Sequence, residues 1–217
     1  MRLNEKPCVV SDVDGVVAYS QIPILETFNA RFGTKVSYAD WRYYSLLLDE
    51  AVRLSGESPA AVAAWLFSAD VLARSPVIPG AVEAIRLLVQ QEIIPYFVTS
   101  RPVSQAEATR GWFAKELPAV KDVRLRGAEQ ASMSGDNFKI DQISQILASI
   151  YIDDDMDIIQ RVSDSVAEGN LSHLHMIFLV DRPWNDQYVC PPNVTRVGSW
   201  RTEDFGWEEI AEIIGKM

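Results

Sequence analysis

The stretch PCVVSDVDGVVAY, residues 7–19, constrains the fold of this chain more than any other. An apolar run ends at Asp12 and Asp14, two carboxylates one residue apart, and Gly15 follows them. Alternate residues of a strand point to the same face, so both carboxylates can reach one ligand. Two such charges repel by about 4 kcal/mol at about 4 Å and an effective dielectric constant of about 20. The pair therefore indicates a cation site, although Asp-Gly after an apolar run also fits a simple turn.

Composition and charge narrow the possible functions. The chain has 217 residues, 48% of them hydrophobic, which allows a sizeable core in one domain with an insertion or in two small domains. The net charge of −10 disfavours a general nucleic-acid surface, because phosphate binding requires a basic stripe. Cys8 and Cys190 are too few for a disulfide framework and predict buried thiols in a reducing compartment. Without a membrane-span or signal-peptide pattern, we expect a cytoplasmic protein.

Short apolar runs alternate with amphipathic helical patterns along the chain. The runs are rich in Val, Ile, Phe and Tyr and show little polar alternation, as in a parallel sheet covered on both faces. This alternation predicts an α/β fold with a doubly wound, mostly parallel, Rossmann-like sheet. The predicted strands are 8–12, 93–99, 122–126, 149–153 and 175–180.

The helical patterns also predict which residues face the sheet and where helices begin. In the helix expected over 79–90, Val82, Ile85 and Val89 fall on one face. A further helix is expected to open at Pro102, because proline is preorganised for the first helical turn.

One interval is too long for this alternation. About 85 residues separate Asp12 from Thr99, whereas a strand–helix–strand unit needs about 30, which leaves roughly 55 in surplus. The surplus has helical patterns, including a helix that Ser58 caps and Pro59 begins. We therefore expect a core domain of residues 1–17 and 77–217, and a small helical cap domain of residues 18–76 inserted after the first strand.

Polar residues gather where the predicted strands end, and ligands of open α/β sheets bind beyond the carboxyl ends of the strands. Carboxylates from two strands, hydroxyls from a third and one lysine would converge there. Such an oxygen-rich site suits Mg²⁺ and leaves positions for water and a substrate phosphate. The residues are Asp12, Asp14, Thr99, Ser100, Lys139 and the acidic run 153–157.

The acidic run allows two assignments. Asp153 and Asp154 directly follow an apolar run and are the expected functional pair, whereas Asp153 and Asp157, four residues apart, form the alternative. Asp155 and Asp157 also fit a solvated helix start, because carboxylates favour the N-terminal end of a helix dipole.

The order and type of these motifs resemble the haloacid dehalogenase-like superfamily of phosphotransferases. DVDGV resembles its first motif, Thr99 its second, Lys139 its third and IDDD its fourth, all within residues 8–157. The resemblance implies a magnesium-dependent phosphomonoesterase that forms an aspartyl phosphate. Asp12 would attack phosphorus, and Asp14 would protonate the leaving oxygen and later accept a proton from water.

The resemblance also implies how metal and phosphate are held. Mg²⁺ would bind Asp12, Asp154 and the backbone carbonyl of Asp14. The groups expected to hold the phosphoryl oxygens are Lys139, Thr99 and Ser100, with Thr99 preferred over Ser100 because it directly follows the apolar run.

Within the superfamily, the chain is most similar to the 5′(3′)-deoxyribonucleotidases. The similarity extends to ETFNARFG, PGAVEAIRLL, TSRP and SWRTEDFGWEEI. It implies a nucleoside monophosphate substrate and cap aromatics that face the base, although aromatic residues in a small cap also suit its core. The best-matching positions are Tyr43 and Tyr44, with Trp41 and Trp65 as further candidates.

The sequence departs from this family in three places. In the family pattern a proline directly follows the serine, whereas here Arg101 lies between Ser100 and Pro102. Ser20 stands where the family pattern has an aromatic residue. The resemblance does not place residues 180–192. The alternatives are a polynucleotide 3′-phosphatase, a small-metabolite phosphatase, or a non-catalytic binding protein with the same fold. We expect a small phosphate monoester as the partner, no stable nucleic-acid complex and no membrane, and an oligomer is possible.

Overall fold

A computed structural model describes residues 7–43, 45–120, 122–130, 132–202 and 204–216 of the chain. The strands are β1 (Cys8–Ser11), β2 (Ile94–Pro102), β3 (Val123–Arg126), β4 (Ile150–Asp153), β5 (Met176–Val180) and β6 (Val194–Val197). The α-helices are α1 (Gln21–Phe32), α2 (Leu46–Ser55), α3 (Pro59–Leu66), α4 (Ala69–Leu72), α5 (Ala81–Gln90), α6 (Ala106–Glu116), α7 (Gly135–Ile146), α8 (Met156–Ala167) and α9 (Trp207–Gly215). Short 3₁₀ turns cover Tyr38–Asp40, Val103–Gln105 and Ala128–Gln130. Within these ranges, no helix has the length and apolar character needed to cross a membrane.

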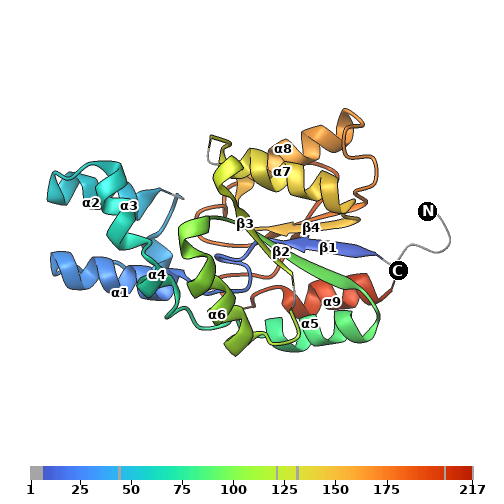
Figure 1. The fold of residues 1–217 in the computed structure, drawn as a ribbon, viewed down its shortest axis with the longest axis horizontal. Coiled ribbons are helices and arrows are strands. Elements are labelled where there is room, and N and C mark those ends of the chain that lie inside the picture. Colours follow the sequence, from blue (N-terminus) through green and yellow to red (C-terminus); the bar gives the residue numbers. More distant parts are fainter. Residues whose placement is uncertain (1–6, 44, 121, 131, 203, 217) are drawn as a thin grey trace.

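The strands form a single sheet in the order β3-β2-β1-β4-β5-β6, and every neighbouring pair is parallel. Helices α7 and α8 cover one face, while α5 and α9 cover the other (Figure 1). The predicted doubly wound α/β fold is therefore confirmed. Strand β6 was not predicted, because its four residues VTRV carry too short an apolar pattern.

Two expectations about helices are wrong. The helix expected from Pro102 begins only at Ala106, because β2 continues through Pro102. Arg101 stays extended there, since a residue that precedes proline avoids the helical region. On α5, Val82 and Val89 are each 41% exposed. The buried side chains of α5 are instead Ala81, Ala84, Ile85 and Leu88.

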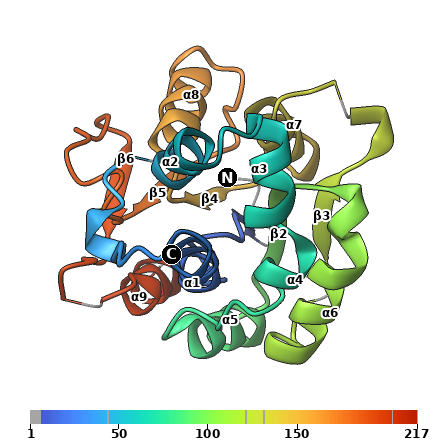
Figure 2. The ribbon, with the colours of Figure 1, turned by 90° about the vertical axis from the view of Figure 1, so that its left-hand side faces the viewer.

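Helices α1 to α4 lie beyond the carboxyl ends of β1 and β2, to one side of the sheet (Figures 1 and 2). They share an apolar cluster of their own that includes Phe28, Trp41 and Leu66, and Trp184 joins it from the loop after β5. Ser58 caps α3 as expected, since its hydroxyl accepts the N–H of Ala61. The boundaries of the cap domain stay a prediction.

The two cysteines form no disulfide with each other. Both Cys8 and Cys190 are half-buried, so the expectation of buried thiols is wrong.

Candidate active site

Three carboxylates meet beyond the carboxyl ends of β1 and β4. Asp12, Asp153 and Asp154 each place one carboxylate oxygen within 4.8 Å of the others. All three are buried, with 5%, 0% and 1% of their surface exposed. Parallel pairing of β1 with β4 sets this distance, and the N–H of Asp12 extends the pairing by donating to the carbonyl of Ile152 at 2.9 Å.

Lys139 of α7 is the cation that faces this cluster. Its Nζ lies 2.9 Å from Asp12 Oδ1 and 2.9 Å from Asp153 Oδ2, and the residue is buried. Ser134 caps the N-terminus of α7 by accepting the N–H of Asn137, which fixes the first turn of the helix. The strand end, the capped helix and the sheet register together place one lysine between two carboxylates.

Asp153 has its oxygens occupied by donors of the chain itself. Its Oδ1 accepts the backbone N–H groups of Asp154 and Asp155 at 2.8 and 3.0 Å. Its Oδ2 accepts from Lys139 and from the hydroxyl of Tyr151. Asp153 therefore holds the turn after β4 in place, which leaves Asp12 and Asp154 as the carboxylates with free capacity.

Two carboxyl groups of this cluster have raised pKa values, mainly because they are buried. Burial raises the pKa of Asp12 to about 7; Lys139 opposes the rise, and the like charges of Asp153 and Asp14 add to it. Burial also raises the pKa of Asp154 well above its ordinary value, with further contributions from Asp153 and Asp12. A dication between Asp12 and Asp154 would favour the ionised form of both.

The residues fit such an ion. Among the described residues, Asp154 Oδ2 is buried and has no hydrogen-bond partner, an arrangement that costs free energy unless a ligand satisfies the oxygen. Gly15 lies against the same oxygen with a φ of +78°, and a Cβ there would collide with it. The backbone thus leaves room around a carboxylate oxygen that no protein donor satisfies. Hard oxygen ligands of this kind suit Mg²⁺.

Asp157 lies outside the cluster. It is exposed in the first turn of α8, and its N–H donates to Asp155 Oδ1 at 2.9 Å. Asp155 is the N-cap of this helix, and burial raises its pKa to about 6. The structure thus brings Asp154, but not Asp157, to Asp12.

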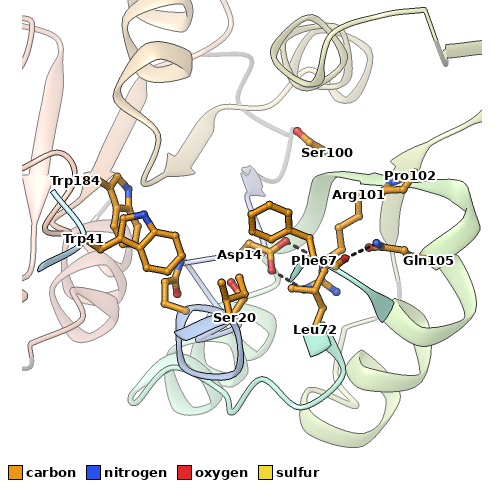
Figure 3. A pocket seen from close by; sticks show the side chains of 12 residues that line it. Asp14, Ser20, Trp41, Phe67, Leu72, Ser100, Arg101, Pro102, Gln105 and Trp184 are labelled. Atoms are coloured by element: carbon orange, nitrogen blue, oxygen red, sulfur yellow. Dashed lines mark hydrogen bonds and ion pairs between the residues drawn. The ribbon is translucent and has the colours of Figure 1, made fainter. Parts of the chain in front are cut away.

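Arg101 faces Asp14 in a bidentate ion pair. Its Nε donates to Asp14 Oδ2 at 2.8 Å and its Nη2 donates to Oδ1 at 2.5 Å (Figure 3). Its Nη1 also donates to Thr109 Oγ1 on α6 at 3.2 Å. The register of β2 shifts between Thr99 and Pro102, and such irregularities re-aim side chains beside active sites. In the sequence, Arg101 stands out only as a departure from the family pattern. An arginine at the end of a predicted strand is nevertheless a signal for a residue of the site.

The two hydroxyls of β2 occupy different places. Thr99 is 1% exposed, and its Oγ1 accepts the N–H of Arg101 at 3.2 Å. Ser100 lines the cavity described below and lies against Gly135 at the start of α7, where a Cβ would collide with its hydroxyl. Their roles toward a phosphate stay predictions.

A cavity of about 290 Å³ opens beside Asp14, between α1, α4 and the end of β2. The rings of Trp41 and Trp184 lie on one side, and Phe67 and Arg101 lie on the other (Figure 3). The centroids of the two tryptophan rings are 5.6 Å apart, and the ring planes are inclined by 52°. Apart from the paired Asp14 and Arg101, its described lining carries no charge. The other lining residues are Ser20, Gln21, Ile24, Leu72, Ser100, Pro102 and Gln105.

The aromatic residues predicted to face a base do not all reach this cavity. Trp41 lines it and is also part of the apolar cluster that α1 to α4 share. Tyr43 is 46% exposed and lines a separate hollow of about 560 Å³ with Trp200 and Arg201. Trp65 lies under the guanidinium of Arg31, 4.2 Å from the ring centroid. Tyr44 falls outside the described residues.

No protein-family profile matches the sequence, and no curated protein is similar to it. Solved structures do match. A protein of Thermotoga maritima described as a β-phosphoglucomutase aligns over 97% of this chain and 99% of its own, with a TM-score of 0.60 and 14% identity. CbbY of Rhodobacter sphaeroides, in complex with phosphate, aligns over 93% and 96%, with a TM-score of 0.59 and 11% identity.

A third structure is that of YfnB from Bacillus subtilis, described as a haloacid dehalogenase-type hydrolase and bound to magnesium. It aligns over 97% of this chain and 99% of its own, with a TM-score of 0.54 and 17% identity. At such identities the likeness concerns the fold. With its parallel six-stranded sheet, its helices on both faces and these structural neighbours, the chain has the Rossmann-like α/β fold of the haloacid dehalogenase-like hydrolases.

Proposed function

We propose that this protein is a magnesium-dependent phosphomonoesterase that forms an aspartyl phosphate on Asp12. The observation that carries the proposal is the buried cluster in which Asp12 lies beside Lys139 and beside Asp154, whose Oδ2 has no hydrogen-bond partner in the part of the chain that the structure describes. Mg²⁺, held by Asp12, Asp154 and the Asp14 carbonyl, would offset the repulsion between a carboxylate nucleophile and a phosphate dianion.

The chain supplies the remaining groups for two successive displacements. A carboxylate oxygen of Asp12 attacks phosphorus, the ester P–O bond breaks, and the leaving oxygen keeps the bonding electron pair and takes a proton from Asp14. Water then attacks the aspartyl phosphate and gives a proton to Asp14, which releases inorganic phosphate and restores Asp12. Lys139 and the hydroxyls of Thr99 and Ser100 hold the phosphoryl oxygens as their charge develops.

The cavity beside Asp14 receives the leaving group. Its flat aromatic walls and its lack of unpaired charge favour an uncharged, planar group, as in a nucleoside. Stacking of a base on an aromatic side chain contributes about 1–3 kcal/mol. We therefore favour a 5′(3′)-deoxyribonucleotidase, with Trp41 as the stacking residue and nucleoside monophosphates as substrates. The net charge of −10 disfavours the ends of nucleic-acid strands.

A second candidate is a phosphatase of small metabolites. Structural neighbours include proteins described as a β-phosphoglucomutase and as a phosphoglycolate phosphatase, the latter from Lactobacillus delbrueckii with a TM-score of 0.60 and 13% identity. A screen of the purified protein with Mg²⁺ separates the candidates. It compares kcat/KM for nucleoside monophosphates, phosphoglycolate, glucose 1-phosphate and a 3′-phosphorylated oligonucleotide. Highest values for the nucleotides support the first candidate, whereas highest values for phosphoglycolate or the sugar phosphate support the second.

Replacing Trp41 should separate base binding from chemistry. Trp41→Leu removes a ring that lines the cavity, so we expect KM for nucleoside monophosphates to rise about tenfold, the loss expected from about 1.4 kcal/mol. Turnover of p-nitrophenyl phosphate should change little. Tyr43→Ala is the matched control, because Tyr43 lines the separate hollow. Steady-state kinetics on both substrates measure this. Equal losses on both would assign Trp41 to the cap core, and a larger effect of Tyr43→Ala would move the base to the other hollow.

Replacing Arg101 should reveal its action on Asp14. The guanidinium fork fixes the plane of the Asp14 carboxylate, so Arg101→Gln should misalign the group that protonates the leaving oxygen. We expect kcat for a nucleotide to fall about a hundredfold. The loss should be much smaller for p-nitrophenyl phosphate, whose leaving group needs no proton. Arg101→Lys keeps the charge without the fork and should resemble Arg101→Gln. Equal losses on both substrates would instead make Arg101 a phosphate-binding residue.

A further inference from the structure

The segment DRPWN, residues 181–185, follows β5, and apart from Trp184, which lines the cavity beside Asp14, its residues have no part in the function proposed above. Loops usually lie on the surface, yet all five of these residues are buried. Asp181, Arg182, Trp184 and Asn185 are 6%, 1%, 5% and 0% exposed. The buried polar side chains of this loop need hydrogen-bond partners. Some of these partners lie in the acidic cluster.

Asn185 uses its whole amide group. Its Nδ2 donates to the carbonyl of Asp154 at 2.8 Å and to that of Val180 at 2.9 Å. Its Oδ1 accepts the N–H of Arg182 at 3.1 Å and Nη1 of Arg196 at 2.8 Å. Two donors and two acceptor positions are thereby filled, which no other side chain of this size could reproduce.

Trp184 adds a second donor to the same carbonyl. Its Nε1 donates to the carbonyl of Asp154 at 3.2 Å. The backbone of Asp154 is thus fixed from two sides, while its carboxylate oxygen Oδ2 has no partner among the described residues. Fixing the main chain while leaving the side-chain oxygen free is the arrangement expected around a metal ligand.

Arg182 makes the equivalent contact with the loop after β1. Its Nε and Nη2 donate to the carbonyl of Gly15 at 2.8 and 2.6 Å, and its Nη1 donates to the carbonyl of Asp181. Its guanidinium lies 5.4 Å from the ring centroid of Phe205. Gly15 directly follows Asp14, so one loop holds the backbone on both sides of the metal cluster.

We propose that Asn185 is a positioning residue for Asp154, assisted by Trp184, and that Arg182 does the same for the loop of Asp12 and Asp14. Together they hold the two acidic loops at the separation that a divalent ion requires. The inference rests on the proposed metal site and adds residues that are not themselves metal ligands, of which Trp184 also lines the cavity proposed for the leaving group. Loss of such supporting partners typically lowers metal affinity about 10- to 100-fold.

The test is metal binding by the whole protein, measured apart from turnover. Titration of metal-free protein with Mn²⁺, followed by calorimetry, gives Kd, and the Mg²⁺ concentration for half-maximal activity gives a second value. We expect Asn185→Ser to weaken both about 10- to 100-fold. At saturating Mg²⁺, the KM for substrate should match that of the wild type, and kcat should recover. Trp184→Phe keeps an aromatic ring in the cavity wall but removes the donor to the Asp154 carbonyl, so it should shift the metal constants in the same direction by less.

Asn29→Ser is the matched control. Asn29 also anchors a backbone with its amide, since its Nδ2 donates to the carbonyl of Val36 at 2.8 Å and its Oδ1 accepts the N–H of Val36 at 2.9 Å. It lies in the cap, so its loss should lower thermal stability without changing the metal constants. If Asn185→Ser and Trp184→Phe also leave the metal constants unchanged, the loop has a structural role only and the inference is wrong. Wild-type protein that binds no Mn²⁺ would instead overturn the proposed metal site itself.

Discussion

Asp12→Asn should abolish turnover while leaving the fold intact. The neutral amide cannot attack phosphorus as a carboxylate does, and loss of a catalytic nucleophile lowers kcat by about a thousandfold or more. Stability should not fall in metal-free protein, because burial raises the pKa of Asp12 to about 7 and so disfavours its ionised form in the fold. Lys139 keeps Asp153 as a partner at 2.9 Å. Steady-state kinetics and thermal unfolding without metal measure the two effects.

Asp155→Ala is the control for this experiment and should show the opposite profile. Asp155 accepts the N–H groups of Asp157 and Ile158 as the N-cap of α8, so its loss should cost about 1 kcal/mol of stability and leave most turnover. ¹⁹F NMR adds a direct observation, since the wild-type protein should form a beryllofluoride adduct and Asp12→Asn should not. More than a few per cent of residual turnover in Asp12→Asn would contradict the covalent mechanism.

Removing the metal, or its free carboxylate ligand, should have the second large effect. Chelator should abolish activity, and Asp154→Asn should lower kcat and weaken Mn²⁺ binding, because Oδ2 of Asp154 lies in the acidic cluster and accepts no hydrogen bond from any described residue. Asp157→Asn is the matched control at an exposed position of α8 and should change both values by less than about twofold, as most surface substitutions do. A larger loss in Asp157→Asn would restore the alternative pair of Asp153 and Asp157.

The pH dependence of metal binding follows from the same cluster. Burial raises the pKa of Asp12 to about 7, so a metal that binds the carboxylate must displace a proton at lower pH. Apparent affinity for Mg²⁺ should therefore rise as the pH increases through about 7, and because burial also raises the pKa of Asp154, the second carboxylate ligand, the rise should continue above that pH. Calorimetric titrations at several pH values, in buffers of different ionisation enthalpy, measure both affinity and proton release. An affinity that stays constant across this range would show that Asp12 is already ionised without metal.

Local patterns in the sequence determined much of the fold. Apolar runs without polar alternation, separated by helical patterns, indicate a sheet covered on both faces, and the six parallel strands show one. The spacing of Asp12 and Asp14 placed them at the end of a strand, and Ser58 marked a helix start that the structure confirms. These features depend on residues near each other in the chain, where backbone geometry alone sets which side chains share a face.

Packing between distant segments decided the rest. On α5, two sets of positions fit a helical repeat and could have formed the buried face: 82, 85 and 89, or 81, 84, 85 and 88. Only contact with the sheet and α9 decided that the second set is buried. Only the family resemblance distinguished Asp154 from Asp153 as the metal ligand. In the structure, Lys139 and Tyr151 donate to Asp153, whereas Asp154 Oδ2 has no hydrogen-bond partner among the described residues. The ion pair between Arg101 and Asp14 joins segments far apart in the chain. The hydrogen bond from Asn185 to the carbonyl of Asp154 does the same. Such contacts have no local signature, because they exist only once the sheet register has fixed where each strand ends.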